Sequence, residues 1–136
     1  MISVGIFGAS GYMGGEALRV LLDHPEVEIA WATSRQPGKI EDFHPNLYGC
    51  GISLIHPDEA THCDLVFMAL PTDVSIVIAS RFIEGNTRVI DLGSAFRLKD
   101  RETWERVYGM SHPIWSLAEQ AIYGVSELHL DKIVGA

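Results

Sequence analysis

Apolar residues along the chain form short continuous runs, and segments with helical spacing separate these runs. Continuous apolar runs of this length are typical of strands buried on both faces of a parallel sheet. In Gly14–Asp23 and Thr72–Ile83 the apolar residues recur at helical spacing. We therefore predict strand–helix–strand units with right-handed crossovers and a parallel sheet. The four predicted main strands are Ile2–Phe7, Val27–Ala32, Asp64–Leu70 and Arg88–Leu92.

The remaining segments fit between these elements. We expect a short additional strand at Ile52–Ile55 and the start of a fifth main strand at Ile133–Ala136. Glycine and proline recur through Thr33–Gly51, which predicts a long loop, and Gly93–Tyr108 reads as a loop with a short polar helix. The predicted fold is a single α/β domain with a Rossmann-type, doubly wound, mainly parallel sheet. The side chains of the second helix expected to face that sheet are Val74, Val77, Ile78 and Phe82.

The composition is that of one globular domain with an acidic surface. The chain has 136 residues, of which 47% are hydrophobic and 21% charged, and its formal net charge is −8. This length corresponds to one domain, and the acidic balance argues against nucleic acid or an anionic membrane as a partner. No apolar run approaches the roughly 18 residues of a membrane span, and the N-terminus lacks the basic segment of a signal peptide. Two cysteines give no disulfide framework, so we expect a cytoplasmic protein.

A glycine-rich turn directly follows the first predicted strand and directly precedes the first helix. In this G-x-x-G-x-x-G pattern, glycines allow a tight turn, a close backbone approach to a pyrophosphate and close packing of helix on strand. The anion would then rest on the free N–H groups at the start of the helix. The alternative is a glycine-rich turn that binds nothing. The candidate cofactor-binding residues in this segment are Gly8, Ser10, Gly11, Tyr12, Met13 and Gly14.

The end of the second strand indicates the type of dinucleotide. A site that prefers NAD usually carries Asp or Glu there, on the ribose 2′-hydroxyl. The segment here contains Ser34 and Arg35 and no acid. A hydroxyl and a guanidinium suit a 2′-phosphate, so we predict NADP, with Ser34 and Arg35 as its ligands. The alternative is a surface arginine in a polar loop.

Polar residues also follow the third and fourth strands, at the sheet edge where open α/β folds bind ligands. After the third strand, Leu70, Pro71 and Ser75 are candidate cofactor contacts. For the neighbouring Thr72 and Asp73, contact with the cofactor and a plain N-cap role in the following helix are both open. Ser94 and Arg97 follow the fourth strand and are further candidate ligand-binding residues; the alternative for Arg97 is a surface salt bridge.

At this level of detail the chain resembles the N-acetyl-gamma-glutamyl-phosphate reductase family, within the semialdehyde dehydrogenase superfamily. The resemblance extends over nearly the whole chain. Its motifs are Gly8–Gly14 with Glu16, Arg19–Pro25, Thr33–Arg35, Ala69–Pro71 with Ser75, Val89–Leu92 with Phe96–Leu98, Tyr108-Gly109 with His112-Pro113, and Tyr123–Val125 with Glu127-Leu128.

The resemblance implies an activity. Members of that family bind NADP in this domain and reduce an acyl phosphate to an aldehyde through a thioester on a catalytic cysteine. By the same resemblance, Ser94 and Arg97 would bind the substrate, and Arg97 would hold the phosphate of the acyl phosphate. The chain departs from the family at three places. Thr72-Asp73 replaces His-Gly, and Ser126 replaces proline. Before Phe96-Arg97 the chain has Gly93–Ala95, where the family usually has Ser-Ala-Asp.

The family's catalytic cysteine would lie just beyond Ala136, so we expect an N-terminal domain without its catalytic residues or its substrate and dimerisation domain. Cys63 precedes its strand, at the end opposite to the ligand edge, and Cys50 lies in a loop. Neither is expected to act as the nucleophile, and the histidines and cysteines lack the spacing of a zinc site. An apolar docking face would favour weak self-association into a homo-oligomer. Trp104, Tyr108, Trp115 and Tyr123 could line a site or cover such a face.

Other functions remain open from the sequence. One is the cofactor domain of an aspartate-semialdehyde dehydrogenase or of a lysine-pathway analogue. Another, of a different class, is a stand-alone NADP-binding sensor or interaction module that performs no chemistry.

Overall fold

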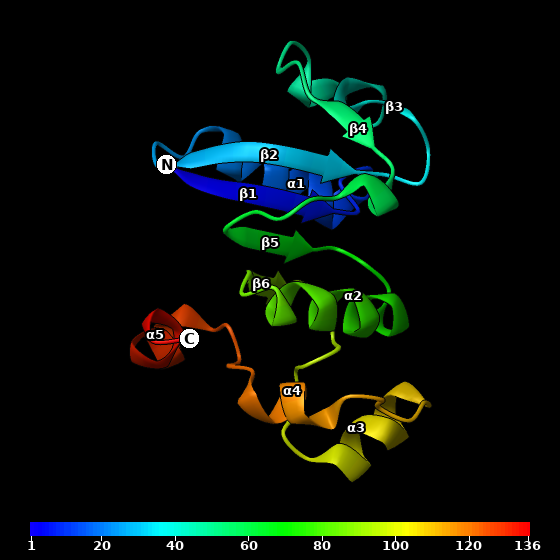
Figure 1. Ribbon diagram of the computed structural model, residues 1–136, viewed down its shortest axis with the longest axis vertical. Coiled ribbons are helices and arrows are strands. Elements are labelled where there is room, and N and C mark those ends of the chain that lie inside the picture. The colour runs from blue at the N-terminus through cyan, green and yellow to red at the C-terminus, as the bar shows by residue number, and fades with distance from the viewer.

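The computed structural model describes residues 1–136 and contains one six-stranded sheet, with the strand order β3-β4-β2-β1-β5-β6. All neighbouring strands run parallel except β3 and β4, which are antiparallel. The predicted α/β fold with a mainly parallel sheet is confirmed (Figure 1). The strands are β1 (Ile2–Phe7), β2 (Val27–Thr33), β3 (Gly38–Lys39), β4 (Ser53–Ile55), β5 (Leu65–Met68) and β6 (Arg88–Asp91).

Five α-helices and three short 3-10 helices connect or follow the strands. None of the helices combines the length and the hydropathy that a membrane crossing requires. The α-helices are α1 (Tyr12–Leu22), α2 (Thr72–Glu84), α3 (Arg101–Tyr108), α4 (Trp115–Gln120) and α5 (Ser126–Val134), and the 3-10 helices are η1 (Ile40–Asp42), η2 (Pro45–Leu47) and η3 (Pro57–Glu59).

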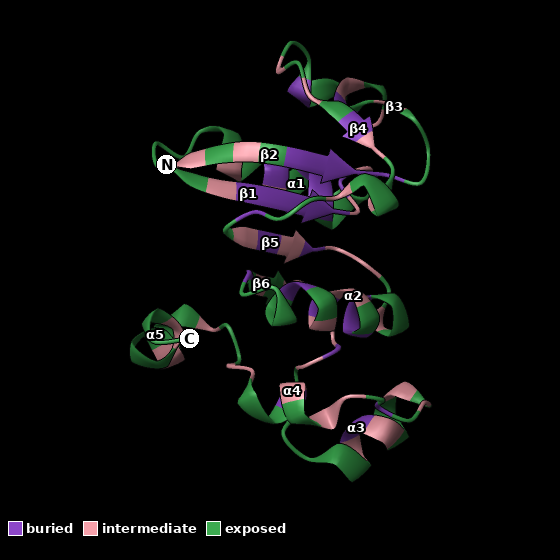
Figure 2. Ribbon diagram, in the orientation of Figure 1, coloured by how far each residue is buried: buried purple, intermediate pink, exposed green.

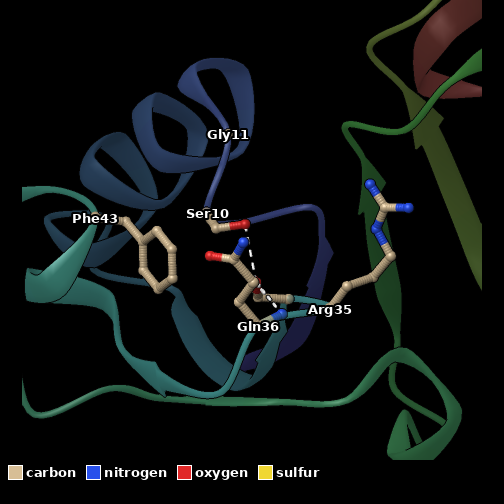
Figure 3. Close-up of a pocket in the computed structure, with 6 residues that line it drawn as sticks. Ser10, Gly11, Arg35, Gln36 and Phe43 are labelled. Atoms are coloured by element: carbon tan, nitrogen blue, oxygen red, sulfur yellow. Dashed lines mark hydrogen bonds between the residues drawn. The ribbon is translucent and has the colours of Figure 1, made fainter.

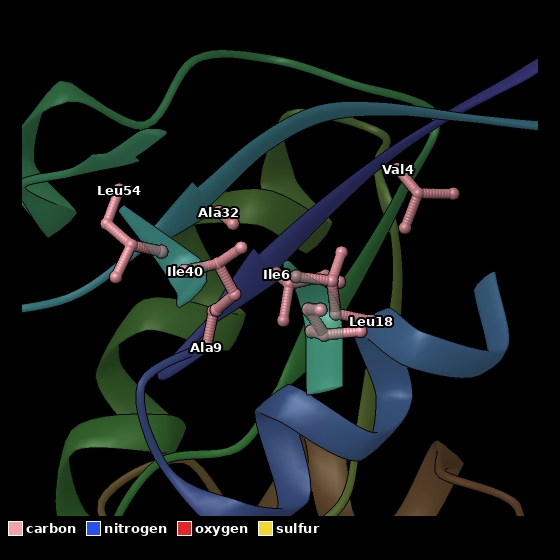
Figure 4. Packing of buried hydrophobic residues seen from close by; sticks show 8 residues of the cluster. Val4, Ile6, Ala9, Leu18, Ala32, Ile40 and Leu54 are labelled. Atoms are coloured by element: carbon pink, nitrogen blue, oxygen red, sulfur yellow. The ribbon is translucent and has the colours of Figure 1, made fainter. Parts of the chain in front are cut away.

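The central strand β1 supplies side chains to two separate cores. Ile6 packs with Leu18 of α1 in one core, which Figure 4 shows from close by. Its neighbour Phe7 points to the opposite face and packs with Phe82 of α2, at a ring-centroid distance of 5.5 Å. Successive residues of a strand point to opposite faces, so a run that is apolar throughout serves both cores. Complete burial of each such side chain contributes about 1.5–3 kcal/mol.

Burial is greatest at the carboxyl ends of β1 and β2. In β2, Val27–Ala30 is exposed or half-buried, whereas Trp31, Ala32 and Thr33 are buried (Figure 2). The glycine-rich turn after β1 is therefore set on the best-packed part of the sheet.

The face of α2 differs from the prediction. Val74 and Val77 are exposed, whereas Ser75, Ile76, Ala79 and Phe82 are buried. The helix is rotated relative to the expected stripe because Ser75 finds a carboxylate partner inside, and a polar residue with such a partner can be buried. Phe82 and the half-buried Ile78 do pack against the sheet-side core, as predicted.

The C-terminal segment also differs from the prediction. Ile133 and Val134 belong to helix α5 and form no strand, so β6 is an edge of the sheet. Two β-branched residues are too few to define a strand, and Glu127, Leu128 and Lys132 in the same segment favour a helix. Figure 2 shows α5 largely exposed, and it contains no buried residue.

The segment predicted as a long loop, Thr33–Gly51, contains β3, η1 and η2. Its buried hydrophobic residues Ile40 and Leu47 join the core around α1. Farther along the chain, α3 and α4 form a small third core, in which Trp104 is completely buried. The short polar helix expected before Tyr108 is α3, and Asp100 caps it by accepting from the Thr103 N–H at 2.8 Å.

Candidate functional site

The glycine-rich turn between β1 and α1 is shaped by two glycines that no other residue can replace without displacing backbone. Gly8 has φ +76°, and a Cβ there would lie 2.2 Å from the carbonyl oxygen of Ala69. A Cβ on Gly14 would lie 2.2 Å from the carbonyl oxygen of Gly8. At Gly11 the nearest such atom is 3.4 Å away, so Gly11 is less confined. The turn therefore packs against β5 on one side and against the first turn of α1 on the other.

This turn and the start of α1 contain main-chain donors that have no partner in the protein. Gly11 N–H is bonded to the Gly8 carbonyl, and Gly15 N–H to the Gly11 carbonyl. The helix starts at Gly11 without a side-chain cap. Free N–H groups at a helix start attract an anion, because the helix dipole adds to their partial charges. Within the segment that these two hydrogen bonds span, four N–H groups have no acceptor in the chain. They are the N–H groups of Ser10, Tyr12, Met13 and Gly14.

The end of β2 holds the turn in place. Thr33 accepts the Gly8 N–H on its hydroxyl at 3.3 Å and the Ala9 N–H on its carbonyl at 2.9 Å. The Ser34 hydroxyl donates to Ser10 Oγ at 3.0 Å and accepts from the Gln36 N–H at 3.0 Å. The two sequence segments predicted to hold the pyrophosphate and the 2′-phosphate are thus hydrogen-bonded to each other.

A polar pocket of about 490 Å³ opens between these two segments. Figure 3 shows Ser10 and Gln36 close together, Phe43 on one side, and the Arg35 side chain extending away from them. Arg35 is exposed and forms no ion pair with an acidic residue. Gln36 and Phe43 were not singled out from the sequence, although an aromatic residue in a polar loop is a usable signal. The residues that line the pocket are Ser10, Gly11, Ser34, Arg35, Gln36 and Phe43.

The candidate residues after β5 have different environments. Pro71 is the N-cap of α2 and Leu70 is half-buried beside it. Ser75 is completely buried, and its hydroxyl donates to Asp91 Oδ1 at 2.6 Å. The side chain of Ser75 is therefore bonded to Asp91 inside the protein and is not exposed on the surface. The N-cap interpretation of Thr72 and Asp73 is wrong. Pro71 occupies the N-cap position of α2, and no side chain caps the start of this helix.

Ser94 and Arg97 lie on the loop after β6, beside the start of α2. The hydroxyls of Ser94 and Thr72 are hydrogen-bonded at 2.8 Å. Arg97 is exposed and donates to the Gly93 carbonyl at 2.9 Å. It pairs with no carboxylate, so the surface salt bridge considered for it is not formed. Its guanidinium keeps further N–H donors for a ligand.

The aromatic residues of the C-terminal part do not form one wall. Trp104 is buried and donates its indole N–H to the Ser94 carbonyl at 3.0 Å, which fixes the loop after β6. Tyr108 and Trp115 are half-buried around the same small core, and Tyr123 is exposed. Of these four, Trp104 therefore has the closest link to the candidate substrate residues.

Cys63 does not have the environment of a nucleophile. Cys63 is buried, its thiol donates to the Leu65 carbonyl at 3.3 Å, and burial raises the pKa of that thiol. A raised pKa keeps the unreactive thiol form. Cys50 is half-buried in the loop before β4, and both cysteines are free. No three side chains of the metal-ligating types come together in the chain.

The family of the chain is established by comparison with known proteins. Residues 3–136 match the family described as semialdehyde dehydrogenase, NAD binding domain. Among curated relatives, the N-acetyl-gamma-glutamyl-phosphate reductase of Neisseria meningitidis serogroup C (strain 053442) is 46% identical over 140 residues, which is 99% of this chain and 40% of the relative. The enzyme of the same name from Azotobacter vinelandii is 43% identical over 142 residues, covering 100% of this chain and 41% of the relative. The chain thus spans about 40% of the length of these relatives.

Solved structures agree with this placement. Aspartate semialdehyde dehydrogenase with NADP from Candida albicans matches at a TM-score of 0.60 and 27% identity, over 74% of this chain and 32% of that chain. A 3-ketoreductase from Actinomadura kijaniata, at a TM-score of 0.57 and 19% identity over 98% of this chain and 42% of that chain, shares the fold. The glycine turn after β1, the parallel sheet and the match over residues 3–136 lead to one conclusion: the chain belongs to the family of semialdehyde dehydrogenase NAD-binding domains.

Proposed function

We propose that this chain is the NADP-binding domain of an N-acetyl-gamma-glutamyl-phosphate reductase, an enzyme that reduces an acyl phosphate to a semialdehyde in arginine biosynthesis. The observation that carries the proposal is that the segments after β1 and β2 are hydrogen-bonded to each other at the carboxyl ends of these strands. One segment offers four unpartnered N–H groups, and the other offers Ser34 and Arg35 with no acidic residue.

The chemistry of these groups fits NADP. The N–H groups at the start of α1 suit the pyrophosphate, and the hydroxyl and guanidinium suit the 2′-phosphate. An acid at the end of β2 would repel a 2′-phosphate, and none lines the pocket. NADPH bound here would supply the hydride. We propose Gly8, Ser10, Gly11, Tyr12, Met13, Gly14, Ser34, Arg35, Leu70 and Pro71 as the cofactor-binding residues, with Ser75 in support through Asp91.

Ser94 and Arg97 are the proposed substrate residues. They lie on the loop after β6, which is separated from β1 by β5 alone. This loop is at the carboxyl ends of the parallel strands, the same end of the sheet as the proposed cofactor-binding residues. The planar fork of Arg97 can hold two phosphate oxygens at once, which positions an acyl phosphate more tightly than a point charge does.

The reaction also requires a thiolate and an acid–base group. The thiolate attacks the acyl carbon, phosphate leaves with the electrons of the broken C–O bond, and hydride addition to the thioester releases the aldehyde and the thiolate. Because Cys63 is buried and Cys50 lies in the loop before β4, we propose that a cysteine and a histidine outside this chain supply these groups. The free thiols agree with a reducing cytoplasm.

The test is an assay of the polypeptide at the length of its relatives, beside the isolated chain. We expect phosphate-dependent reduction of NADP with N-acetylglutamate semialdehyde by the longer polypeptide alone. Aspartate semialdehyde serves as the competing substrate, since aspartate semialdehyde dehydrogenase is a structural relative. A preference for aspartate semialdehyde, or turnover with neither substrate, would contradict the proposal; the latter result favours a binding module without chemistry.

A further inference from the structure

The carbonyl of Ala9, in the middle of the glycine-rich turn, is held by a side chain from a distant loop. Ala9 is completely buried, and no main-chain N–H donates to its carbonyl oxygen. His44 Nε2 lies 2.9 Å from that oxygen. Because a carbonyl only accepts, Nε2 carries the proton in this contact and donates it. His44 is thus the hydrogen-bond partner of a buried carbonyl that would otherwise be unsatisfied.

The imidazole is fixed in this place by its surroundings. Its Nε2 lies so close to α1 that an ideal Cβ on Gly15 would stand 2.2 Å from it. The main chain of His44 is held on both sides, because its N–H donates to the Ile40 carbonyl at 2.9 Å and its carbonyl accepts from Leu47 N–H at 2.9 Å. Ile40 and Leu47 are themselves buried in the same core as Ala9. The ring is therefore held in position by the core of the protein.

The peptide bond between Ala9 and Ser10 transmits this contact to the site. In a trans peptide the C=O and the N–H point in opposite directions. The Ser10 N–H shares the peptide plane with the Ala9 carbonyl, has no acceptor in the chain, and belongs to a residue that lines the pocket. A hydrogen bond that holds the carbonyl toward His44 therefore holds the Ser10 N–H on the opposite side.

We infer that His44 is a positioning residue that aims the Ser10 N–H at the pyrophosphate of the dinucleotide. The inference rests on the proposed function, because it concerns the same cofactor site. His44 touches the turn and not the ligand. Both the neutral ring with a proton on Nε2 and the protonated ring can make this donation, so the contact does not depend on the charge of the ring.

The test compares three substitutions at this position in the chain as it stands. Glutamine can place an amide N–H near the position of Nε2, whereas asparagine is too short and alanine has no donor. We expect His44→Ala and His44→Asn to weaken NADP binding by about tenfold, and His44→Gln to bind within about twofold of the wild type. The matched control is His24→Ala, since His24 also precedes a proline but follows the C-terminal end of α1, where it is exposed and its Nδ1 accepts the Glu26 N–H.

A second ligand separates positioning from general damage. Adenosine 2′-monophosphate carries the 2′-phosphate and no pyrophosphate, so we expect all His44 variants to bind it as the wild type does in titrations followed by nuclear magnetic resonance. Thermal unfolding shows which variants are folded. If His44→Ala does not fold, the comparison of glutamine with asparagine decides.

Three results would overturn the inference alone. They are unchanged NADP binding by folded His44→Ala or His44→Asn, failure of folded His44→Gln to restore binding, and equal weakening of NADP and adenosine 2′-monophosphate. A wild-type chain that binds no NADP would overturn the proposed function, and this inference with it.

Discussion

The hydroxyl of Ser34 donates to Ser10 Oγ across 3.0 Å, although the two residues belong to different loops. Ser34 also accepts from the Gln36 N–H, and its side chain is buried. One hydroxyl therefore fixes the distance between the N–H groups proposed for the pyrophosphate and the loop proposed for the 2′-phosphate. A dinucleotide would bind both segments at once. Because their distance is already fixed, less conformational entropy of the two loops is lost on binding.

Removal of this hydroxyl should weaken cofactor binding more than folding. In Ser34→Ala we expect NADP affinity to fall by about 1–2 kcal/mol, or roughly five- to thirtyfold, because two hydrogen bonds at the site are lost. The measurement is calorimetric titration with NADP. Ser53→Ala is the control, because Ser53 is exposed and has no side-chain hydrogen bond in the structure. Equal NADP affinity in Ser34→Ala and the wild type would contradict this role.

Gly8 should be far less tolerant of substitution than a glycine of similar backbone conformation elsewhere. Gly8→Ala combines a positive φ with a backbone clash at 2.2 Å, so we expect a loss of about 2–4 kcal/mol in the free energy of unfolding. Gly49 has φ +83° and no atom within 4 Å of its Cβ position, so Gly49→Ala should cost only about 1–2 kcal/mol. Urea unfolding measures both. Equal losses would show that the turn relaxes around the added methyl group.

Protonation of the Asp64 carboxylate should lower the stability of the folded protein in acid. The pKa of its carboxyl is held below the ordinary value of 3.8, mainly by hydrogen bonds from the Ser3 hydroxyl and N–H at 2.7 and 2.8 Å. The folded state thus binds the proton less readily than the unfolded state. The stabilisation is complete above the ordinary value and is lost as the pH falls through the lowered pKa.

We therefore expect the stability of Asp64→Asn to fall less steeply than that of the wild type as the pH is lowered below about 4. Urea unfolding over a series of pH values gives this slope. Asp131→Asn removes an exposed carboxylate that makes no hydrogen bond, and so controls for the change in net charge. The same slope in Asp64→Asn and the wild type would refute the prediction.

Ser75 should matter for folding more than for cofactor contact. Its hydroxyl donates to Asp91 Oδ1 at 2.6 Å, and Asp91 Oδ2 accepts the Ala95 N–H at 3.3 Å. In Ser75→Ala we expect a loss of about 1–3 kcal/mol in unfolding free energy, since the half-buried carboxylate loses a partner. NADP affinity should change by less than about threefold. Unchanged stability with lost NADP binding would instead make Ser75 a direct ligand.

The sequence predicted the parts of the fold that local pattern determines. The four apolar runs became strands because runs apolar throughout suit a sheet covered on both faces. The glycine turn was found because its spacing reflects backbone geometry, as at Gly8 and Gly14. Contacts between distant residues leave no such pattern. The burial of Ser75 depends on Asp91, and the role of His44 depends on a carbonyl far away in the sequence.

The C-terminal error has a similar physical origin. Ile133 and Val134 have strand propensity, yet a strand needs a neighbour with which to pair, and propensity alone does not supply one. In the structure the segment is helical from Ser126, and β6 keeps a free edge. The pocket residues Gln36 and Phe43 were missed because the loop that carries them folds back over the turn, which its glycines and prolines do not reveal.

The most direct test of the NADP site is a calorimetric titration of the chain with NADP and with NAD, repeated for Arg35→Ala and for the control Arg88→Ala at the start of β6. We expect NADP to bind the wild type more tightly than NAD. Arg35→Ala should lose about 1.5–3 kcal/mol of NADP affinity, about tenfold or more, because a charged contact to phosphate is removed, while its NAD affinity stays nearly unchanged. Arg88→Ala should match the wild type with both ligands. Equal losses of NADP and NAD affinity in Arg35→Ala, or tighter binding of NAD by the wild type, would contradict an NADP site at Ser34 and Arg35.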